Sequence, residues 1–317
     1  MTQRHQYQST ITADLAGLRL DQALAKLFPQ FSRARLQRWL AENAISVDGA
    51  TGVSAKTRVV GGENVVVDAV LEQVETWQPQ KIDLAIVYED PDIVVINKPP
   101  NRVVHPAAGN REGTLLNALL HHAPQLAALP RAGIVHRLDK DTSGLLVVAK
   151  SLAAHTHLVR ALQARTVKRE YDAIVVGEVI SGGTVTASMG RHPVDRKRMA
   201  VIETGKAAVT HYRVHERFAG YTWLRVSLET GRTHQIRVHL AHIRFPIVGD
   251  PVYGGRLKIP PGASDGVRNA LRGFKRQALH AARLGLEHPT TGEWCEWEVA
   301  PPSDFLALVE VLRQHGA

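Results

Sequence analysis

Between residues 86 and 299 the sequence is a succession of short apolar runs separated by turns, with few helical patterns between them. Such a succession fits an α+β fold with a mixed, largely antiparallel β-sheet and flanking helices better than a regular alternation of strands and helices. Strands are expected at 86–88, 93–96, 134–135, 145–149, 171–176, 209–214, 221–228, 279–286 and 294–299. Helices are expected at 115–121, 152–163 and 303–316.

A weakly patterned stretch divides the chain. Residues 70–81 are rich in Glu, Gln, Thr and Pro, and Gln78–Pro79 disfavours a helix. The chain has 317 residues, which is enough for two domains. We therefore expect a small module at 17–69, a linker at 70–81 and a larger domain at 82–317. In the module, leucines at helical spacing (Leu20, Leu24 and Leu27) precede a second amphipathic helix.

The charge of the chain favours a polyanionic partner. Lys and Arg number 39 against 30 Asp and Glu, which gives a net charge of +9. Two clusters carry much of this charge, and for each an ordinary solvated surface is the alternative to a contact with RNA phosphates. The first comprises Arg33, Arg35 and Arg38 on the second helix, with Lys56 and Arg58 after it, and the second comprises Arg191, Arg196, Lys197 and Arg198.

Several other classes of protein are disfavoured. No apolar stretch approaches the roughly 18 residues of a membrane span, and the N-terminus is polar, so a cytoplasmic protein without a membrane partner is expected. The sequence has no P-loop, dinucleotide-binding, nucleophile-elbow or zinc-protease motif. His234, His239 and His242 suggest a metal site, but no carboxylate accompanies them and nearby arginines would repel a cation. We therefore expect no metal.

The segment GIVHRLDKDTSGLLVVAK, residues 133–150, concentrates reactive side chains. It predicts a polar loop held between two apolar strands, which is a rigid place for a reactive carboxylate. Asp139 and Asp141 are both candidates on composition. A hairpin end stabilised by Asp and Ser side chains is an equally good interpretation of the spacing alone.

The motif HRLDKDTSGLLVVAK resembles the catalytic motif of the RluA-type pseudouridine synthases. Four further segments resemble motifs of that family and occur in the family's order: INKPPNRVVHPAAGN, KREYDAIVVGEV, ETGRTHQIRVHLAH and GDPVYGG. Residues 17 to about 69 resemble the S4-type RNA-binding module that many members carry in front of the catalytic domain. The likeness covers nearly the whole chain.

The resemblance implies the roles of individual residues. Asp139 would be the nucleophile that detaches uracil from its ribose, so that the base can rotate and rejoin through carbon. Arg237 would keep that carboxylate ionised when a flipped base excludes water, and Tyr171 would stack on the base and take part in proton removal. From sequence alone, Arg237 is as credible as a phosphate contact or a structural ion pair, and Tyr171 as a core residue.

Other residues match the surroundings of that site. Arg137 would fill the stack that the flipped uridine leaves, although it could instead pair with Asp141. His105, Arg232 and His234 would line the substrate pocket. Asp141 lies beyond the catalytic position of the motif, which favours a structural role.

The implied activity is the isomerisation of uridines in large-subunit ribosomal RNA, with the stem-loop at the subunit interface as substrate. No cofactor is implied, because the isomerisation consumes nothing. The expected partner is ribosomal RNA, either free or within an assembling large subunit, and the protein is expected to be a monomer. The alternatives are a synthase of the same type with another ribosomal or transfer RNA target, or a non-catalytic RNA-binding protein of ribosome assembly.

Overall fold

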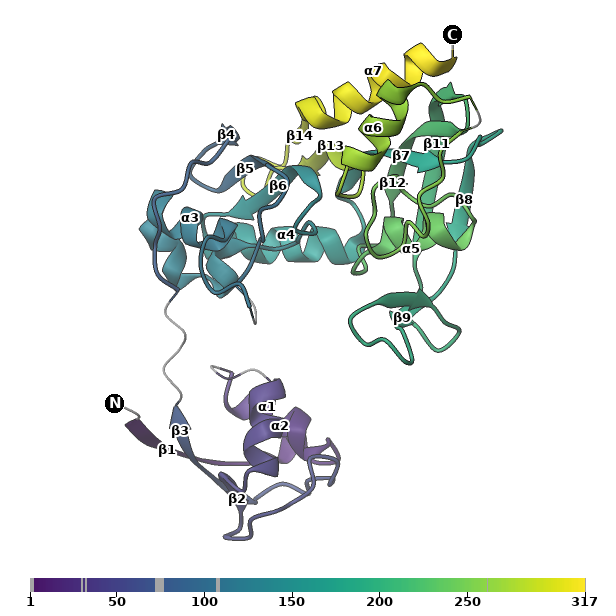
Figure 1. The fold of residues 1–317 in the computed structure, drawn as a ribbon. Coiled ribbons are helices and arrows are strands. Elements are labelled where there is room, and N and C mark those ends of the chain that lie inside the picture. The colour runs from purple at the N-terminus through teal and green to yellow at the C-terminus, as the bar shows by residue number, and fades with distance from the viewer. Residues whose placement is uncertain are drawn as a thin grey trace. The chain divides into compact units, whose positions relative to one another are not determined.

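The computed structural model describes residues 3–29, 31, 33–71, 77–106, 109–260 and 262–316. The chain forms two compact units, an N-terminal unit (Met1–Thr76) and a C-terminal unit (Trp77–Ala317) (Figure 1). The division falls inside the stretch 70–81 that the sequence predicts as a linker, and residues 72–76 of that stretch lie outside the described residues. The end of the stretch belongs to the C-terminal unit, where the Gln80 amide donates to the Asn117 carbonyl.

The N-terminal unit is a three-stranded antiparallel sheet packed against two helices. The strand order is β1-β3-β2. The core contains Leu20 and Leu24 of the first helix, Leu36 and Trp39 of the second, and Val65 of the sheet. Strand β1 precedes residue 17, so the unit begins earlier than the predicted module. The bounds are β1 Gln3–Thr10, α1 Leu20–Leu27, α2 Arg33–Ala41, β2 Ile45–Val47 and β3 Asn64–Leu71.

The C-terminal unit is built on a nine-stranded sheet, in the order β4-β5-β6-β13-β7-β12-β11-β8, with β14 paired to β13. Among the described strands β6 and β13 form a parallel pair, and the other neighbours in this sheet are antiparallel. The predicted mixed α+β fold is therefore confirmed. The bounds are β4 Ile86–Glu89, β5 Ile93–Lys98, β6 Ser143–Ala149, β7 Lys168–Val176, β8 Gly183–Thr186, β11 Val209–Phe218, β12 Tyr221–Leu228, β13 Leu279–Glu287 and β14 Trp294–Glu298.

Three features of the strands differ from the prediction, one of which is that strand β8 was not expected. The expected strand at 134–135 was wrong, because Ile134 forms only an isolated bridge to Val148. A separate two-stranded ribbon of β9 (Met189–Arg191) and β10 (Met199–Val201) carries the second basic cluster. Its strands are three residues long, which is too short for a hydrophobic period to show in the sequence.

Helices cover both faces of the sheet where its strands are most apolar. Along β5, Val94 and Ile96 pack on the side of helix α3, whereas Ile93 and Val95 pack on the side of α4. The predicted helices α3, α4 and α7 are confirmed, and α5 and α6 were not predicted. No helix in the described part of the chain is long and apolar enough to span a bilayer. The bounds are α3 Leu115–His122, α4 Leu152–Ala164, α5 Gln235–His242, α6 Asp265–Gly273 and α7 Ser303–Gly316.

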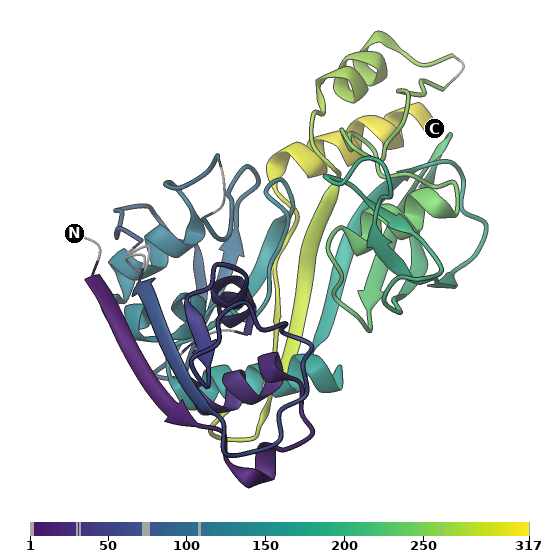
Figure 2. The same ribbon diagram turned by 90° about the horizontal axis from the view of Figure 1, so that it is seen from below.

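The parallel pairing of β6 with β13 depends on a glycine. Gly144 has a φ of +111°, and a Cβ atom there would lie 2.2 Å from the Ala281 carbonyl oxygen. Only glycine tolerates both conditions. The residues that follow Asp139 in the chain are thus joined directly to the central strand, which lies between the two halves of the sheet in Figure 2.

Candidate active site

The loop that carries Asp139 is fixed at several points. Val147 donates its amide to His136 Nε2 at 3.1 Å, and the Thr142 amide donates to the Asp139 carbonyl at 3.1 Å. Lys98 is fully buried beneath the loop, and its ammonium donates to the Lys140 carbonyl at 2.9 Å. Burial lowers the pKa of Lys98 to about 7, against the raising effect of Asp141 and Asp139. These bonds make the loop rigid, as the predicted role of Asp139 as a nucleophile requires.

Asp139 and Arg237 are in contact across 98 positions of sequence. Arg237 Nη1 donates to Asp139 Oδ2 at 2.9 Å, and the Asp139 side chain is 17% exposed, so the carboxylate lies within reach of a ligand. Helix α5 supplies the arginine and buries most of its side chain. The contact that the sequence analysis expected between these two groups is therefore present.

Arg237 also has a second acidic partner. Its Nε and Nη2 atoms donate to the two carboxylate oxygens of Asp250 at 2.7 and 2.9 Å. Burial alone would raise the pKa of Asp250, but the guanidinium of Arg237 and the amides of Val252 and Tyr253 hold it below its usual value. This bidentate pair fixes the plane of the guanidinium and leaves Nη1 directed at Asp139.

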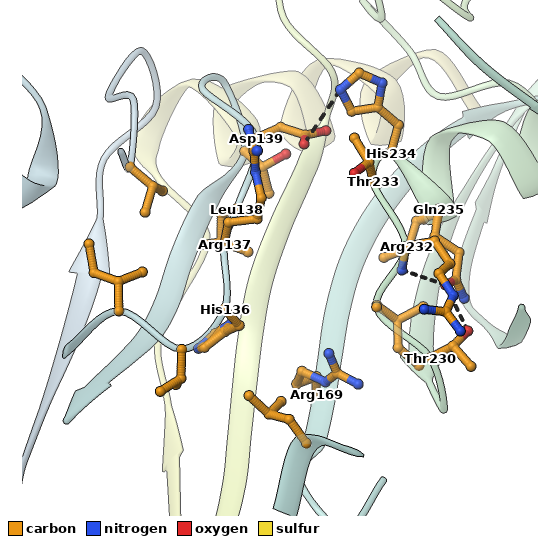
Figure 3. Close-up of a pocket in the computed structure, with 18 of the residues that line it drawn as sticks. His136, Arg137, Leu138, Asp139, Arg169, Thr230, Arg232, Thr233, His234 and Gln235 are labelled. Atoms are coloured by element: carbon orange, nitrogen blue, oxygen red, sulfur yellow. Dashed lines mark hydrogen bonds and ion pairs between the residues drawn. The ribbon is translucent and has the colours of Figure 1, made fainter. Parts of the chain in front are cut away.

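His234 lies on the other side of the Asp139 carboxylate, with Nε2 3.7 Å from Oδ1 (Figure 3). It adopts a left-handed backbone conformation (φ 58°) at the start of α5. Burial lowers its pKa, and Asp139 opposes that shift. Tyr253 holds the ring through a 2.8 Å bond between its hydroxyl and His234 Nδ1, and the tyrosine oxygen accepts the Met199 amide. Burial therefore favours the neutral form of this imidazole.

Tyr171 lies on β7 and lines the same pocket as Asp139 and Arg237. It is 6% exposed, and burial raises its pKa, with Asp139 adding to the rise and Arg169 opposing it. The phenol therefore keeps its proton at neutral pH. That state suits stacking on a base better than removal of a proton.

The pocket around these residues has a volume of about 860 Å³, near the upper end of the ~300–1,000 Å³ range of ligand sites. Its lining is strongly basic, with Asp139 and Glu229 as its acidic members. A pocket of this size and charge fits part of a nucleic acid strand. The arginines that line it are Arg131, Arg137, Arg165, Arg169, Arg232 and Arg237.

Other predicted pocket residues also lie in this lining. Arg137 is exposed, and no ion pair joins it to Asp141 in the described part of the chain. His105 stacks edge-on against Trp77 with ring centroids 4.8 Å apart. Arg232 is exposed and donates to the Ala207 carbonyl at 3.3 Å. The structure thus brings every predicted catalytic and pocket residue to one cavity.

The second basic cluster forms the turn of the β9–β10 ribbon. Arg191, Arg196 and Lys197 are exposed, and Arg191 donates to the Arg196 carbonyl at 3.2 Å. Arg198 instead packs over the Tyr253 ring at 5.3 Å. Since Tyr253 also contacts His234, this ribbon is joined to the pocket through one tyrosine.

The predicted basic residues of the N-terminal unit have several different contacts. Arg33 donates to the buried carboxylate of Asp21 at 2.6 Å, Arg35 lies over the Trp39 ring at 5.8 Å, and Arg38 lies 3.8 Å from Glu42. Lys56 is exposed, and Arg58 donates to the Gly17 carbonyl at 2.7 Å. Asp21 has a pKa of about 2, because hydrogen bonds from Arg33, Gln37 and Arg19 outweigh the raising effect of burial. Arg33 therefore has a structural role that its sequence did not reveal.

Two of the three histidines considered as metal ligands, His234 and His239, bond to other parts of the protein. Both ring nitrogens of the buried His239 bond to the protein, at Thr210 Oγ1 and the Ala187 carbonyl. Among the described residues a different group has metal-compatible spacing, namely Asp90, Asp92 and His288. Both carboxylates in that group already accept hydrogen bonds, Asp90 from His288 and Asp92 from Ser151 and Thr290. These hydrogen bonds stabilise the turns that carry the three residues, and they account for the cluster without a metal.

The sequence analysis missed Lys98, His136, Arg169, Asp250 and Tyr253. A signal existed for all five, because each lies inside a motif quoted above: Lys98 in INKPPNRVVHPAAGN, His136 in HRLDKDTSGLLVVAK, Arg169 in KREYDAIVVGEV, and Asp250 and Tyr253 in GDPVYGG. A fully buried lysine at the end of a strand that begins with four apolar residues is itself unusual. The partners of Arg237 and His234 could not be read from spacing, since they depend on tertiary contacts.

Comparisons with known proteins agree with this geometry. Human RNA Pseudouridylate Synthase Domain Containing 4 has a similar solved structure, with a TM-score of 0.57 and 27% identity, covering 72% of this chain and 93% of that chain. Human RNA Pseudouridylate Synthase Domain Containing 1 gives a TM-score of 0.54 and 29% identity, covering 70% of this chain and 85% of that chain. The family model described as RNA pseudouridylate synthase matches residues 92–242, which include Asp139, Tyr171 and Arg237.

The chain therefore belongs to the RNA pseudouridylate synthase family, whose members are isomerases. Its curated relatives include Ribosomal large subunit pseudouridine synthase D of Pseudomonas aeruginosa, 56% identical over 99% of this chain and 98% of the relative. The protein of that name from Escherichia coli K12 is 53% identical over 99% of this chain and 96% of the relative.

Proposed function

We propose that this enzyme isomerises uridines of large-subunit ribosomal RNA to pseudouridine, with the stem-loop at the subunit interface as its target. Similarity over nearly the full length of relatives with that substrate class in their names supports the RNA target. The observation that carries the catalytic part is the Asp139–Arg237–Asp250 arrangement inside a basic pocket. Ribosomal RNA, free or in an assembling subunit, is the partner, and the enzyme acts as a cytoplasmic monomer.

In the proposed mechanism, Asp139 is the nucleophile. The target uridine is flipped into the pocket at a cost of a few kcal/mol, and the exposed Arg137 fills the vacated stack. Tyr171 stacks on the base while Asp139 attacks the nucleotide. The bond between ribose C1′ and base N1 breaks, the base rotates, and C1′ bonds to C5. The bond that Asp139 formed to the nucleotide breaks in turn, which regenerates the free carboxylate. The proton leaves C5, N1 gains a proton, and no other reagent is consumed.

We expect the purified protein to form pseudouridine in large-subunit ribosomal RNA. Reverse-transcription stops after carbodiimide treatment would locate each product. Naked RNA and partly assembled subunits, each prepared from cells lacking the enzyme, would be compared as substrates. Product only in transfer RNA would establish a different target, and RNA binding with no product in any RNA would favour a non-catalytic assembly protein.

The N-terminal unit is proposed as an S4-like RNA-binding module covering residues 17 to about 69, with the linker at 70–81 and the catalytic domain at 82–317. Two basic segments meet at the first turn of α1, where Arg33 binds the Asp21 side chain and the Asp21 amide donates to the Ala55 carbonyl, next to Lys56. Arg35, Arg38 and Arg58 belong to the same two segments. Basic side chains of this kind suit RNA phosphates.

The β9–β10 ribbon is expected to contact RNA phosphates. Replacing Arg196 and Lys197 by Ala should weaken RNA binding and reduce the slope of log affinity against log salt by about 2, because each lost phosphate contact lowers it by about 1. Filter binding at several salt concentrations measures this. Val194→Ala, a change at an exposed uncharged position of the same turn, serves as the control. An unaltered slope in the double variant would mean that the ribbon does not contact the RNA backbone.

A further inference from the structure

Arg169 is a buried cation for which the described protein offers no counter-ion. It is 8% exposed and lines the pocket, and no described carboxylate or carbonyl accepts a hydrogen bond from it. Its Nε atom is buried with no partner. An unpaired buried charge is costly, so a ligand that supplies an anion there would be bound favourably.

Nearby carboxylates have other partners. Glu170 is adjacent on β7 but points to the opposite face of the sheet, where it lies near Arg225 and Arg283. In the pocket, Asp139 is bound by Arg237, and Glu229 by His211 and Arg165. His136 offers no acceptor either. Its Nε2 already accepts the Val147 amide, and burial together with the charge of Arg169 lowers its pKa to about 3.

The pocket is shaped to hold this side chain. A Cβ atom at Gly231 would lie 2.7 Å from Arg169 Nη1, so the absence of a side chain at Gly231 makes room for the guanidinium. Arg169 and Tyr171 are two residues apart on β7 and therefore face the same cavity. Figure 3 shows Arg169 at the end of the pocket away from Asp139 and His234.

We propose that Arg169 binds a phosphodiester group of the RNA strand beside the flipped uridine, and so holds that strand in the pocket. An anion is favoured over a base carbonyl because only an anion neutralises the buried charge. The position of Arg169 also favours a phosphate over the target base. The base to be isomerised must lie near Asp139, at the other end of the pocket. The inference rests on the proposed RNA substrate.

The test uses a stem-loop RNA that the wild-type enzyme converts to pseudouridine; failure at that step would bear on the proposed function and not on Arg169. Arg169→Gln is expected to raise Kd and KM about tenfold, lower the salt slope by about 1 and leave kcat at saturating RNA nearly unchanged. Arg169→Lys should keep most of the slope. Gly231→Ala, which displaces the guanidinium, should reproduce part of the Gln effect.

Neutral methylphosphonate linkages, placed singly on either side of the target uridine, identify the phosphate. One of the two linkages should weaken the binding of RNA to the wild-type enzyme about as much as Arg169→Gln does. The same linkage should not weaken the binding of RNA to the Arg169→Gln variant any further. Arg165→Gln, at a pocket arginine that already has a carboxylate partner, should show no such coupling. Thermal melting confirms that each variant is folded. The proposal would be overturned if every linkage weakened RNA binding by the same amount in the Arg169→Gln variant as in the wild type. It would also be overturned if Arg169→Gln lowered kcat alone.

Discussion

Asp139→Asn is expected to lower pseudouridine formation by on the order of 10⁴-fold or more, because an amide cannot form the covalent bond that the proposed mechanism requires. RNA affinity should fall little. The amide has nearly the same shape, and its oxygen can still accept the 2.9 Å hydrogen bond from Arg237. Single-turnover assays with carbodiimide mapping measure the rate, and filter binding measures the affinity.

Asp141→Asn is the matched control, since it makes the same chemical change two residues further along the same loop. Asp141 lines a different cavity, beside Phe274 and Asp304, and is expected to be structural. The control should keep most of its activity. Equal product from Asp139→Asn and the wild type would remove Asp139 from the nucleophile's role, and a dead Asp141→Asn with an active Asp139→Asn would reassign it.

Arg237→Met should have the second largest effect, because it acts on both stability and activity. It would leave Asp250, whose side chain is fully buried, as an unpaired charge, at a cost of roughly 3–5 kcal/mol of unfolding free energy. It would also remove the cation beside Asp139. Urea unfolding measures the first effect, and product formation per folded molecule measures the second.

Arg237→Lys separates charge from geometry. A lysine keeps a positive charge but cannot bind Asp250 bidentately and Asp139 at the same time, so most of the activity should be lost while more of the stability is retained. A fully active lysine variant would show that the fork geometry is unimportant.

The ion pair of Arg237 with Asp250 also predicts that the folded protein loses stability in acid. The folded pKa of Asp250 lies below its unfolded value of about 3.9, so its stabilisation is present above that pH and is lost as the pH falls through the folded pKa.

The sequence predicted the parts of the fold that depend on periodicity. Helices α3, α4 and α7 and the long strands of the sheet have clear apolar patterns, and all were expected. The wrong strand at 134–135 shows the limit of that signal. Ile134 and Val135 are apolar, but only Ile134 makes a bridge. His136, which follows Val135, uses its ring to accept the Val147 amide. An apolar dipeptide alone does not specify strand pairing.

The candidate site was predicted only as far as motifs reach. Asp139, Tyr171 and Arg237 were expected to meet because each lies in a motif, and the structure places all three at one cavity. The supporting contacts could not be predicted: Asp250 clamps Arg237, Tyr253 holds His234, and Asp21 binds Arg33. Each such contact joins two different segments of one unit, 12 to 19 positions apart, and depends on how those segments pack. A charge run in sequence does not show which arginines already have a carboxylate partner.

The sharing of one guanidinium between two carboxylates has a consequence for reactivity. A one-to-one ion pair would quench the electron density of the attacking oxygen, whereas here the Asp250 anion already offsets most of the positive charge that Arg237 brings. The three groups together sum to one negative charge. Asp139 is consequently oriented by its neighbour without being neutralised by it. In the proposed mechanism it would meet the sugar or the ring with a free lone pair.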